Sequence, residues 1–179
     1  MKTLSKLITA TFAGAALFFT TQANAQTITA QKFALSLGIE AGKPTGGATP
    51  YAVFNLGGTV RLQYGLTNDL ALTFTTGGYH FFMENIPGTS TPYNSYGVGP
   101  VKAGIKYFFV PNIYFGAEGG IGVEVTEHGF DGGQKKLLLS PAIGYATEHW
   151  DYALHYESLT GDGNNYGIVA LRVAYGFKL

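Results

Sequence analysis

The 179-residue sequence contains no cysteine, and only 12% of its residues are charged. Without cysteine, the chain has no disulfide framework, no thiolate metal site and no cysteine nucleophile. Soluble domains carry roughly twice that share of charge, about a quarter of their residues. The chain also lacks a polybasic segment, which argues against nucleic acid as a partner. We therefore look for a fold that needs neither disulfides nor a charged surface.

The N-terminus has the pattern of a secretion signal. Lys2 and Lys6 precede an apolar stretch over residues 7–19, and the small-residue site Ala23-Asn24-Ala25 follows. This order predicts a cleavable signal peptide over residues 1–25. The apolar stretch is shorter than the roughly 20 residues with which a helix spans a membrane. Cleavage leaves one domain, residues 26–179, in an exported protein.

Eight runs of the mature chain alternate between apolar and polar residues. Such a period of two predicts β-strands, and an even number of strands is typical of bacterial transmembrane barrels. No run after residue 25 has the pattern of an amphipathic helix. The strands are expected over about residues 32–42, 55–66, 69–82, 97–109, 112–126, 136–147, 149–158 and 166–179.

The connections between these runs alternate in length. Tight turns are expected at 67–69, 110–112 and 148–149, and longer loops at 43–54, 83–96, 127–135 and 159–165. Short periplasmic turns and longer outer loops are typical of outer-membrane barrels, as are two girdles of aromatic residues. One girdle is expected near the turns, from Tyr64, Tyr107, Phe109, Tyr114, Phe115, Tyr145, Trp150, Tyr152, Tyr175 and Phe177. A second is expected near the loops, from Phe54, Phe81, Phe82, Tyr96 and Tyr166.

The two faces of each strand differ in charge and bulk. In the last run, Leu171, Val173 and Tyr175 alternate with Ala170, Arg172 and Ala174, so the charged face is also the face of small residues. A charged face turned to lipid would cost several kcal/mol for each residue near the bilayer midplane, so we predict that the polar face lines the interior. The sixth run is the weakest, because Leu138 falls on the polar face and Pro141 predicts a bulge or a frayed edge.

Three segments resemble the small outer-membrane β-barrel proteins of Gram-negative bacteria, the OmpX/OmpA-type and porin-family group. They are GIEAGKPTG (38–46), RLQYGLTNDLALTFTTGGY (61–79) and VKAGIKYFFVPNIYFGAEGGIG (101–122). The resemblance implies an all-β, eight-stranded, antiparallel up-and-down transmembrane barrel that lies in the cell outer membrane among its lipids. The chain end, Tyr175-x-Phe177-x-Leu179, resembles the signal that the barrel-assembly machinery recognises, with Leu179 where an aromatic residue is usual.

The inward face collects an equal number of acids and bases. An eight-stranded barrel is only wide enough for side chains to fill it, so mutual neutralisation in an ionic plug is expected, with Glu40 between Arg61 and Arg172. The predicted lumen ionic network consists of Glu40, Arg61, Lys102, Lys106, Glu118, Glu124, Asp151, Glu157, Arg172 and Lys178. Open conduction by a narrow channel is the alternative interpretation.

Other chemistry has weaker support in the sequence. Ser140, His155 and Glu157 fall on neighbouring strands and could form a nucleophile, a base and an orienting acid, as a lipid-modifying hydrolase requires. No motif surrounds them, and neither a metal site nor a cofactor is predicted. The function hypotheses are therefore a structural or surface-interaction barrel that acts through its loops, a narrow channel and, third, a hydrolase.

Overall fold

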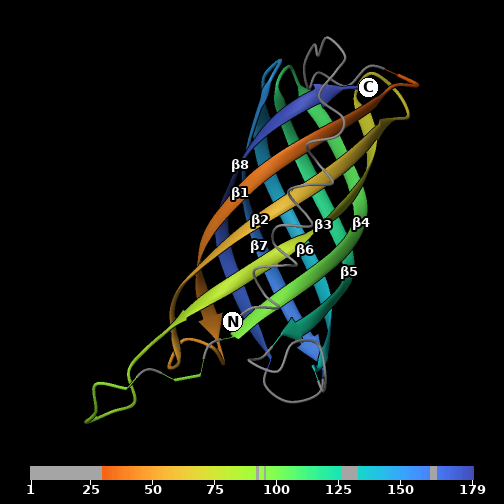
Figure 1. Ribbon diagram of the computed structural model, residues 1–179. Coiled ribbons are helices and arrows are strands. Elements are labelled where there is room, and N and C mark those ends of the chain that lie inside the picture. Colours follow the sequence, from red (N-terminus) through yellow and green to blue (C-terminus); the bar gives the residue numbers. More distant parts are fainter. Residues whose placement is uncertain (1–29, 92, 95, 126–132, 162–164) are drawn as a thin grey trace.

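The protein is a closed barrel of eight antiparallel strands, each paired with its neighbours in the sequence, and β8 pairs with β1. The computed structural model describes residues 30–91, 93–94, 96–125, 133–161 and 165–179, so the predicted signal peptide lies outside the described residues. Figure 1 shows the strands tilted around one axis, with the three short turns at the end opposite the 84–94 loop. The strands are β1 (Phe33–Gly46), β2 (Ala52–Gly65), β3 (Leu70–Met83), β4 (Tyr96–Val110), β5 (Ile113–Val125), β6 (Lys135–Ala146), β7 (Trp150–Gly161) and β8 (Tyr166–Lys178).

The predicted fold class is confirmed, and β1, β2 and β7 extend three or four residues farther towards the loops than predicted. β1 continues to Gly46 because residues 43–46 pair with residues 166–169 of β8. The first loop is therefore shorter than predicted, and Pro44 lies within a strand. At the end of the barrel that carries the short turns, Asn112 adopts a positive φ of 68° in the turn between β4 and β5, a conformation that asparagine tolerates well. No helix in the described part of the chain is long and apolar enough to cross a membrane.

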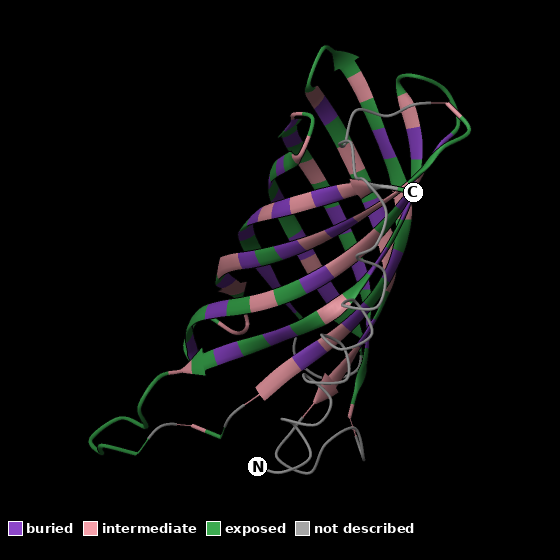
Figure 2. Cartoon of the chain, turned by 45° about the horizontal axis from the view of Figure 1, so that its top comes forward, coloured by how far each residue is buried: buried purple, intermediate pink, exposed green. Residues whose placement is uncertain are grey.

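Burial alternates along every strand, which gives the banded colouring of Figure 2. Arg172 is 1% exposed, whereas its neighbour Leu171 is 51% exposed. Large apolar side chains cover the outside, and charged, hydroxyl and small side chains fill most of the inside, with an apolar layer at the loop end. The predicted polar interior is confirmed, and this surface is what lipid requires of a transmembrane barrel.

Pro141 does not produce the bulge that the sequence suggested for β6. It faces outward, opposite Ala117 of β5. Towards β7 the pairing is interrupted between Leu139 and Ala142, but the register is the same on both sides of the interruption. The missing N–H therefore removes ladder contacts to one neighbour without producing a bulge.

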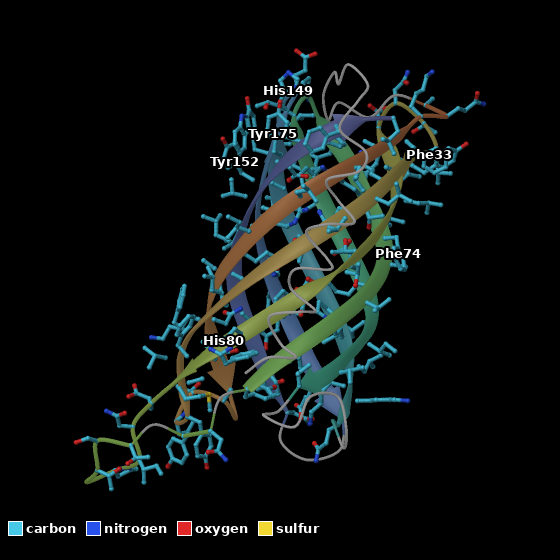
Figure 3. The ribbon with its side chains drawn as sticks, in the orientation of Figure 1. Phe33, Phe74, His80, His149, Tyr152 and Tyr175 are labelled. Atoms are coloured by element: carbon cyan, nitrogen blue, oxygen red, sulfur yellow. The ribbon has the colours of Figure 1, made fainter. Side chains whose placement is uncertain are left out.

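The aromatic girdle at the turn end is confirmed, and Figure 3 shows Phe33, Tyr152 and Tyr175 projecting outward there. Tyr114 is an exception, because it lies inside the barrel at 1% exposure. The girdle predicted at the loop end is wrong for three of its members, since Phe81, Tyr96 and Tyr166 also lie inside. Adjacent strand residues point to opposite faces, so Phe81 and Phe82 cannot both contact lipid.

Candidate functional site

The inward face brings each predicted acid within 4.0 Å of a cation. Four of the five cations are ones that the sequence predicted, and the fifth is Lys136 on β6. Charge-assisted pairs of this kind are stronger than neutral hydrogen bonds. Removing one partner leaves the other charge buried without compensation in a low-dielectric interior. The pairs are Glu40–Arg172, Glu118–Arg61, Asp151–Lys106, Glu157–Lys102 and Glu124–Lys136.

Arg172 lies at the junction of β8 with β1, directly opposite Glu40 in the register. Its Nε is 3.4 Å from Glu40 Oε1 and donates to Thr59 Oγ1 at 3.1 Å, while Nη2 donates to Ser36 Oγ at 3.1 Å. The Thr59 hydroxyl in turn donates to Glu40 Oε1 at 2.9 Å. A Cβ atom at Gly38 would lie 2.9 Å from the guanidinium, so glycine leaves room for this side chain.

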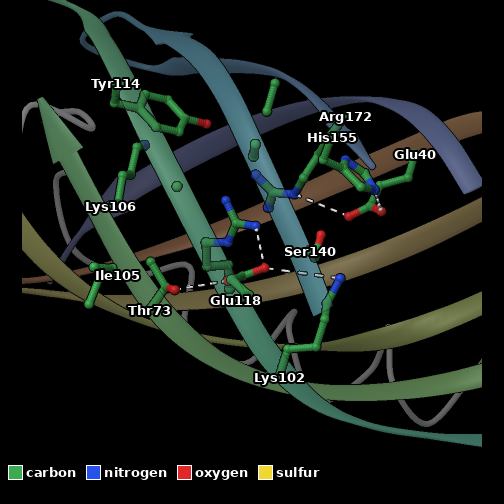
Figure 4. Close-up of a pocket in the computed structure, with 14 residues that line it drawn as sticks. Glu40, Thr73, Lys102, Ile105, Lys106, Tyr114, Glu118, Ser140, His155 and Arg172 are labelled. Carbon is green, nitrogen blue, oxygen red and sulfur yellow. Dashed lines mark hydrogen bonds and ion pairs between the residues drawn. The ribbon is translucent and has the colours of Figure 1, made fainter. Parts of the chain in front are cut away.

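Arg61 does not share Glu40 with Arg172, which corrects the expectation from the sequence. Its Nη2 donates instead to Glu118 Oε2 at 3.0 Å, across the barrel on β5. Thr73 and Thr75 donate to the other oxygen of Glu118 at 2.9 Å and 2.7 Å. Figure 4 shows Glu118 between Thr73 on one side and Lys102 on the other. The carboxylate is therefore held by partners from three strands.

Two further pairs each include a tyrosine that the predicted network lacked. Lys102 donates to Glu157 and, at 3.0 Å, to the hydroxyl of Tyr79, which itself lies 3.3 Å from Glu157. Nearer the turns, Lys106 and Tyr114 each donate to Asp151 at 2.6 Å. The Lys106 ammonium also lies 4.0 Å from the centre of the Tyr114 ring. The inward parity of Tyr79 and Tyr114 was the signal that identifies them.

An apolar layer fills the lumen at the loop end, where the sequence analysis expected lipid-facing aromatics. We call this cluster the inner cap. Its fully buried members are Phe81, Val98, Leu138, Leu159 and Ile168, and Tyr96 and Tyr166 pack against Phe81. The Tyr96 and Tyr166 hydroxyls donate to Glu124 at 3.2 Å, so Glu124 and Lys136 lie with the inner cap rather than with the central pairs.

Little space remains in the centre of the barrel. A cavity of about 20 Å³ is lined by the central charged side chains, among them Glu40, Arg61, Lys102 and Arg172. A space of this size holds about one water molecule. Side chains therefore occupy the lumen at the level of the charged pairs.

Comparisons with known proteins identify the fold and no closer relative. No family model and no curated protein matches the sequence. The structure of Ail, the attachment invasion locus protein of Yersinia pestis, aligns with 83% of this chain and 100% of Ail, at 13% identity and a TM-score of 0.60. OprG of Pseudomonas aeruginosa aligns with 87% of this chain and 99% of its own, at 9% identity and a TM-score of 0.51. Neisserial surface protein A aligns with 80% of this chain and 96% of its own, at 15% identity and a TM-score of 0.51. The chain has the fold of the small eight-stranded outer-membrane barrels.

Within this outer-membrane barrel fold, the structure does not assemble the hydrolase candidates into a relay. Ser140 lies opposite Glu118 in the register, and Glu157 is engaged by Lys102 and Tyr79. The acid beside His155 is Glu40, whose Oε2 lies 3.4 Å from His155 Nε2. Among the described residues, no group of three or more His, Cys, Asp or Glu side chains could hold a metal ion.

The C-terminal residues belong to β8, the strand that closes the barrel by pairing with β1. Tyr175 stacks on His149 at 5.6 Å and meets the Trp150 and Phe177 rings at 5.2 and 5.1 Å. Leu179 is 59% exposed, and its N–H donates to Phe33 at 3.0 Å. Lys178 lies opposite Ala34 in the register. Their role as an assembly signal stays a prediction.

Proposed function

We propose that the protein is an integral barrel of the outer membrane, closed by its own side chains, that acts as a structural or surface-interaction protein through its extracellular loops. The filled lumen carries the proposal: five acid and cation pairs lie inside the barrel, and the cavity that the central charged side chains line has a volume of about 20 Å³. A pore would need a continuous wet path through this region. Catalysis on an external substrate would also need access to Ser140, His155 and Glu157, which are buried.

The loops supply a surface on which such a partner could bind. The 84–94 segment folds back on itself, because the Ile86 N–H donates to the Thr91 carbonyl at 2.9 Å and the Tyr93 N–H to the Glu84 carbonyl at 3.0 Å. The Tyr93 ring meets the Tyr51 ring edge-on at 5.2 Å. Tyr51 is exposed and Tyr93 is half-buried, and tyrosine is enriched in protein-binding surfaces. A rigid barrel would hold this segment above the membrane.

Export, insertion and surroundings belong to the same proposal. The signal peptide over residues 1–25 would direct export, and the C-terminal Tyr175, Phe177 and Leu179 would be read by the barrel-assembly machinery. Two of the similar structures have names that refer to attachment and to the cell surface. These names are compatible with an interaction role and identify no partner for this chain.

Conductance measurements on the refolded protein test the proposal. Folded, full-length mature protein inserted in planar bilayers is expected to give no steady ion current, because the charged pairs and the inner cap fill the lumen. A reproducible unit conductance from the unaltered protein would instead establish the narrow channel. Ester hydrolysis of a phospholipid substrate that disappears in a Ser140→Ala variant would establish the hydrolase.

A further inference from the structure

The described charged residues on the outward faces of the eight strands are few and of one sign. Among the outward-facing side chains that the structure describes on the eight strands, none is acidic, and the only lysines or arginines are Lys43 and Lys135. Lys43 lies near the loop end of β1, and Lys135 is the first residue of β6, which starts at the loop end. On the described outward strand faces, positive charge therefore lies only at the loop end.

Three hydroxyl-bearing side chains on β1 and β7 lie near the first of these lysines. In the register, Lys43 lies opposite Val169 of β8, and Val169 lies opposite Tyr156 of β7. In the next row towards the loops, Thr45 faces Gly167, and Gly167 faces Ser158. The Ser158 and Thr160 hydroxyls are 3.3 Å apart. We call Lys43, Thr45, Tyr156 and Ser158 the rim patch. Thr160 lies opposite Leu137 of β6, one row from Lys135, and is not part of it.

Glycine at position 167 shapes the rim patch. A Cβ atom there would collide with the Tyr156 hydroxyl and would lie 2.8 Å from Thr45 Oγ1. The phenol therefore lies across β8 and places its hydroxyl close to that of Thr45. Thr45 Oγ1 is buried and has no hydrogen-bond partner among the described residues, so it still has a proton to donate.

Apolar side chains continue directly below the rim patch. Leu171, Leu154 and Ile39 are 51%, 52% and 65% exposed on the same three strands. A ligand anchored at the patch would thus lie above a lipid-facing surface, with its apolar part alongside these residues. Tyrosine at the boundary between apolar and polar surface is typical of a membrane interface.

We infer that the rim patch binds the phosphorylated headgroup of a lipid in the outer leaflet. An ammonium group and a set of hydroxyl donors match the oxygens of a phosphate, and no outward acid on these strands would repel it. The position of the patch selects a lipid over a soluble anion, because the acyl chains then pack on Val169, Leu171 and Leu154. The inference rests on the proposed placement of the barrel, with its loops outside the cell.

Native mass spectrometry of the folded barrel, released from neutral detergent, tests this inference. The probes are lipid A, which carries phosphates, its dephosphorylated form and phosphatidylcholine. Wild type is expected to retain lipid A at least about tenfold better than its dephosphorylated form, as the loss of a charged hydrogen bond predicts. It should also prefer lipid A to phosphatidylcholine, whose phosphate charge is balanced by its own choline group. Lys43→Ala with Thr45→Val should lose this preference, and Lys43→Arg should keep it.

Lys135→Ala is the control, because it removes the other outward lysine, which lies outside the rim patch beside Leu137 on its own strand, Val123 on β5 and, one row away, Thr160 on β7. Equal losses in the Lys43 and Lys135 variants would overturn the site in favour of general charge attraction. Displacement of lipid A by millimolar inorganic phosphate would show a soluble-anion site instead. Gel mobility with and without boiling confirms that each variant is folded. If the lipid-binding inference fails, the conductance test of the plugged barrel is unaffected.

Discussion

Arg172 contacts side chains from three strands, so it shows at the residue scale how the interior is held. Ser36 and Glu40 lie on β1 and Thr59 on β2, while Asp151 Oδ2 on β7 is 4.0 Å from Nη1. A guanidinium that is 1% exposed cannot exchange these partners for bulk water. Substitutions that remove a partner should therefore cost more than the contact itself contributes.

Replacing Glu40 by alanine is the direct test of this dependence. The variant leaves Arg172 without its carboxylate, and we expect a loss of about 3 to 5 kcal/mol in the free energy of unfolding, less if water enters the cavity. Urea titration followed by tryptophan fluorescence measures it. Glu84→Ala, in an exposed loop, is the control and should change stability by less than about 1 kcal/mol. Equal stabilities of the two variants would contradict the ionic plug.

Tyr114→Phe isolates a single hydroxyl. It removes the hydrogen bond to Asp151 and keeps the ring beneath Lys106. Because the acceptor is a buried carboxylate, unfolding should become easier by about 1.5 to 3 kcal/mol in the same titration. Tyr107→Phe removes an equivalent hydroxyl from a ring that is 49% exposed on the outer surface. A matching loss in both variants would mean that the Asp151 contact contributes nothing specific.

The sequence predicted which acids lie inside but not which cation each would meet. Parity along a strand places Glu40, Glu118 and Arg61 on the inner face, and this prediction needs no partner strand. Pairing across the lumen depends on the tilt of the barrel, which brings Arg61 of β2 to Glu118 of β5. Lys136 was missed because its run was the least regular.

At the scale of strands, two glycines differ in the room that they leave for a side chain, one on the inner and one on the outer face of the barrel. A Cβ atom at Gly104 would collide with the Ala117 carbonyl oxygen, whereas one at Gly58 would meet nothing within 4 Å. Gly104→Ala should force β4 away from β5 and reduce the folded fraction on unboiled gels. Gly58→Ala should fold fully, since it adds a methyl group on the lipid side. The opposite order would show that the registers of β2 or β4 differ from those described.

The last strand allows a test of assembly as distinct from stability. Alanine at both Tyr175 and Phe177 should reduce the yield of barrel inserted in cells severalfold, because these residues resemble the recognition signal. Tyr51 and Tyr93, which pair in the loops, are a better control than Tyr96, whose ring lies in the inner cap. Heat-modifiable protein in outer-membrane fractions measures the yield. If both double variants insert equally, the signal interpretation fails.

Strand positions were predictable because alternation is local, whereas strand ends were less so. The segment from Lys43 to Gly46 contains Pro and Gly and was expected to be a loop. Its pairing with β8 alone extends β1, and a partner distant in sequence leaves no local signal. The same limit explains why Phe81 was placed in a girdle.

For the whole molecule, the lumen is closed by two layers of different chemistry. Phe81→Ala with Leu138→Ala opens the inner cap and should cost several kcal/mol of stability, about 2 to 5 for each residue, yet the charged pairs should still block current. Adding Glu40→Ala to this variant is expected to produce measurable conductance. Planar bilayer recordings of the single, double and triple variants test the layers separately. Current in the cap variant alone would show that the charged layer does not block ions.

A closed barrel has one joint between strands distant in the sequence, where the first and last strands of the chain meet. Arg172 and Glu40 lie directly opposite each other across that joint. Sliding β8 by one residue would turn the guanidinium into the lipid, and sliding it by two would leave it opposite Gly38 or Gly42. The ion pair can form in only one alignment of the closing strands, so it distinguishes a correctly sealed barrel from a misaligned one.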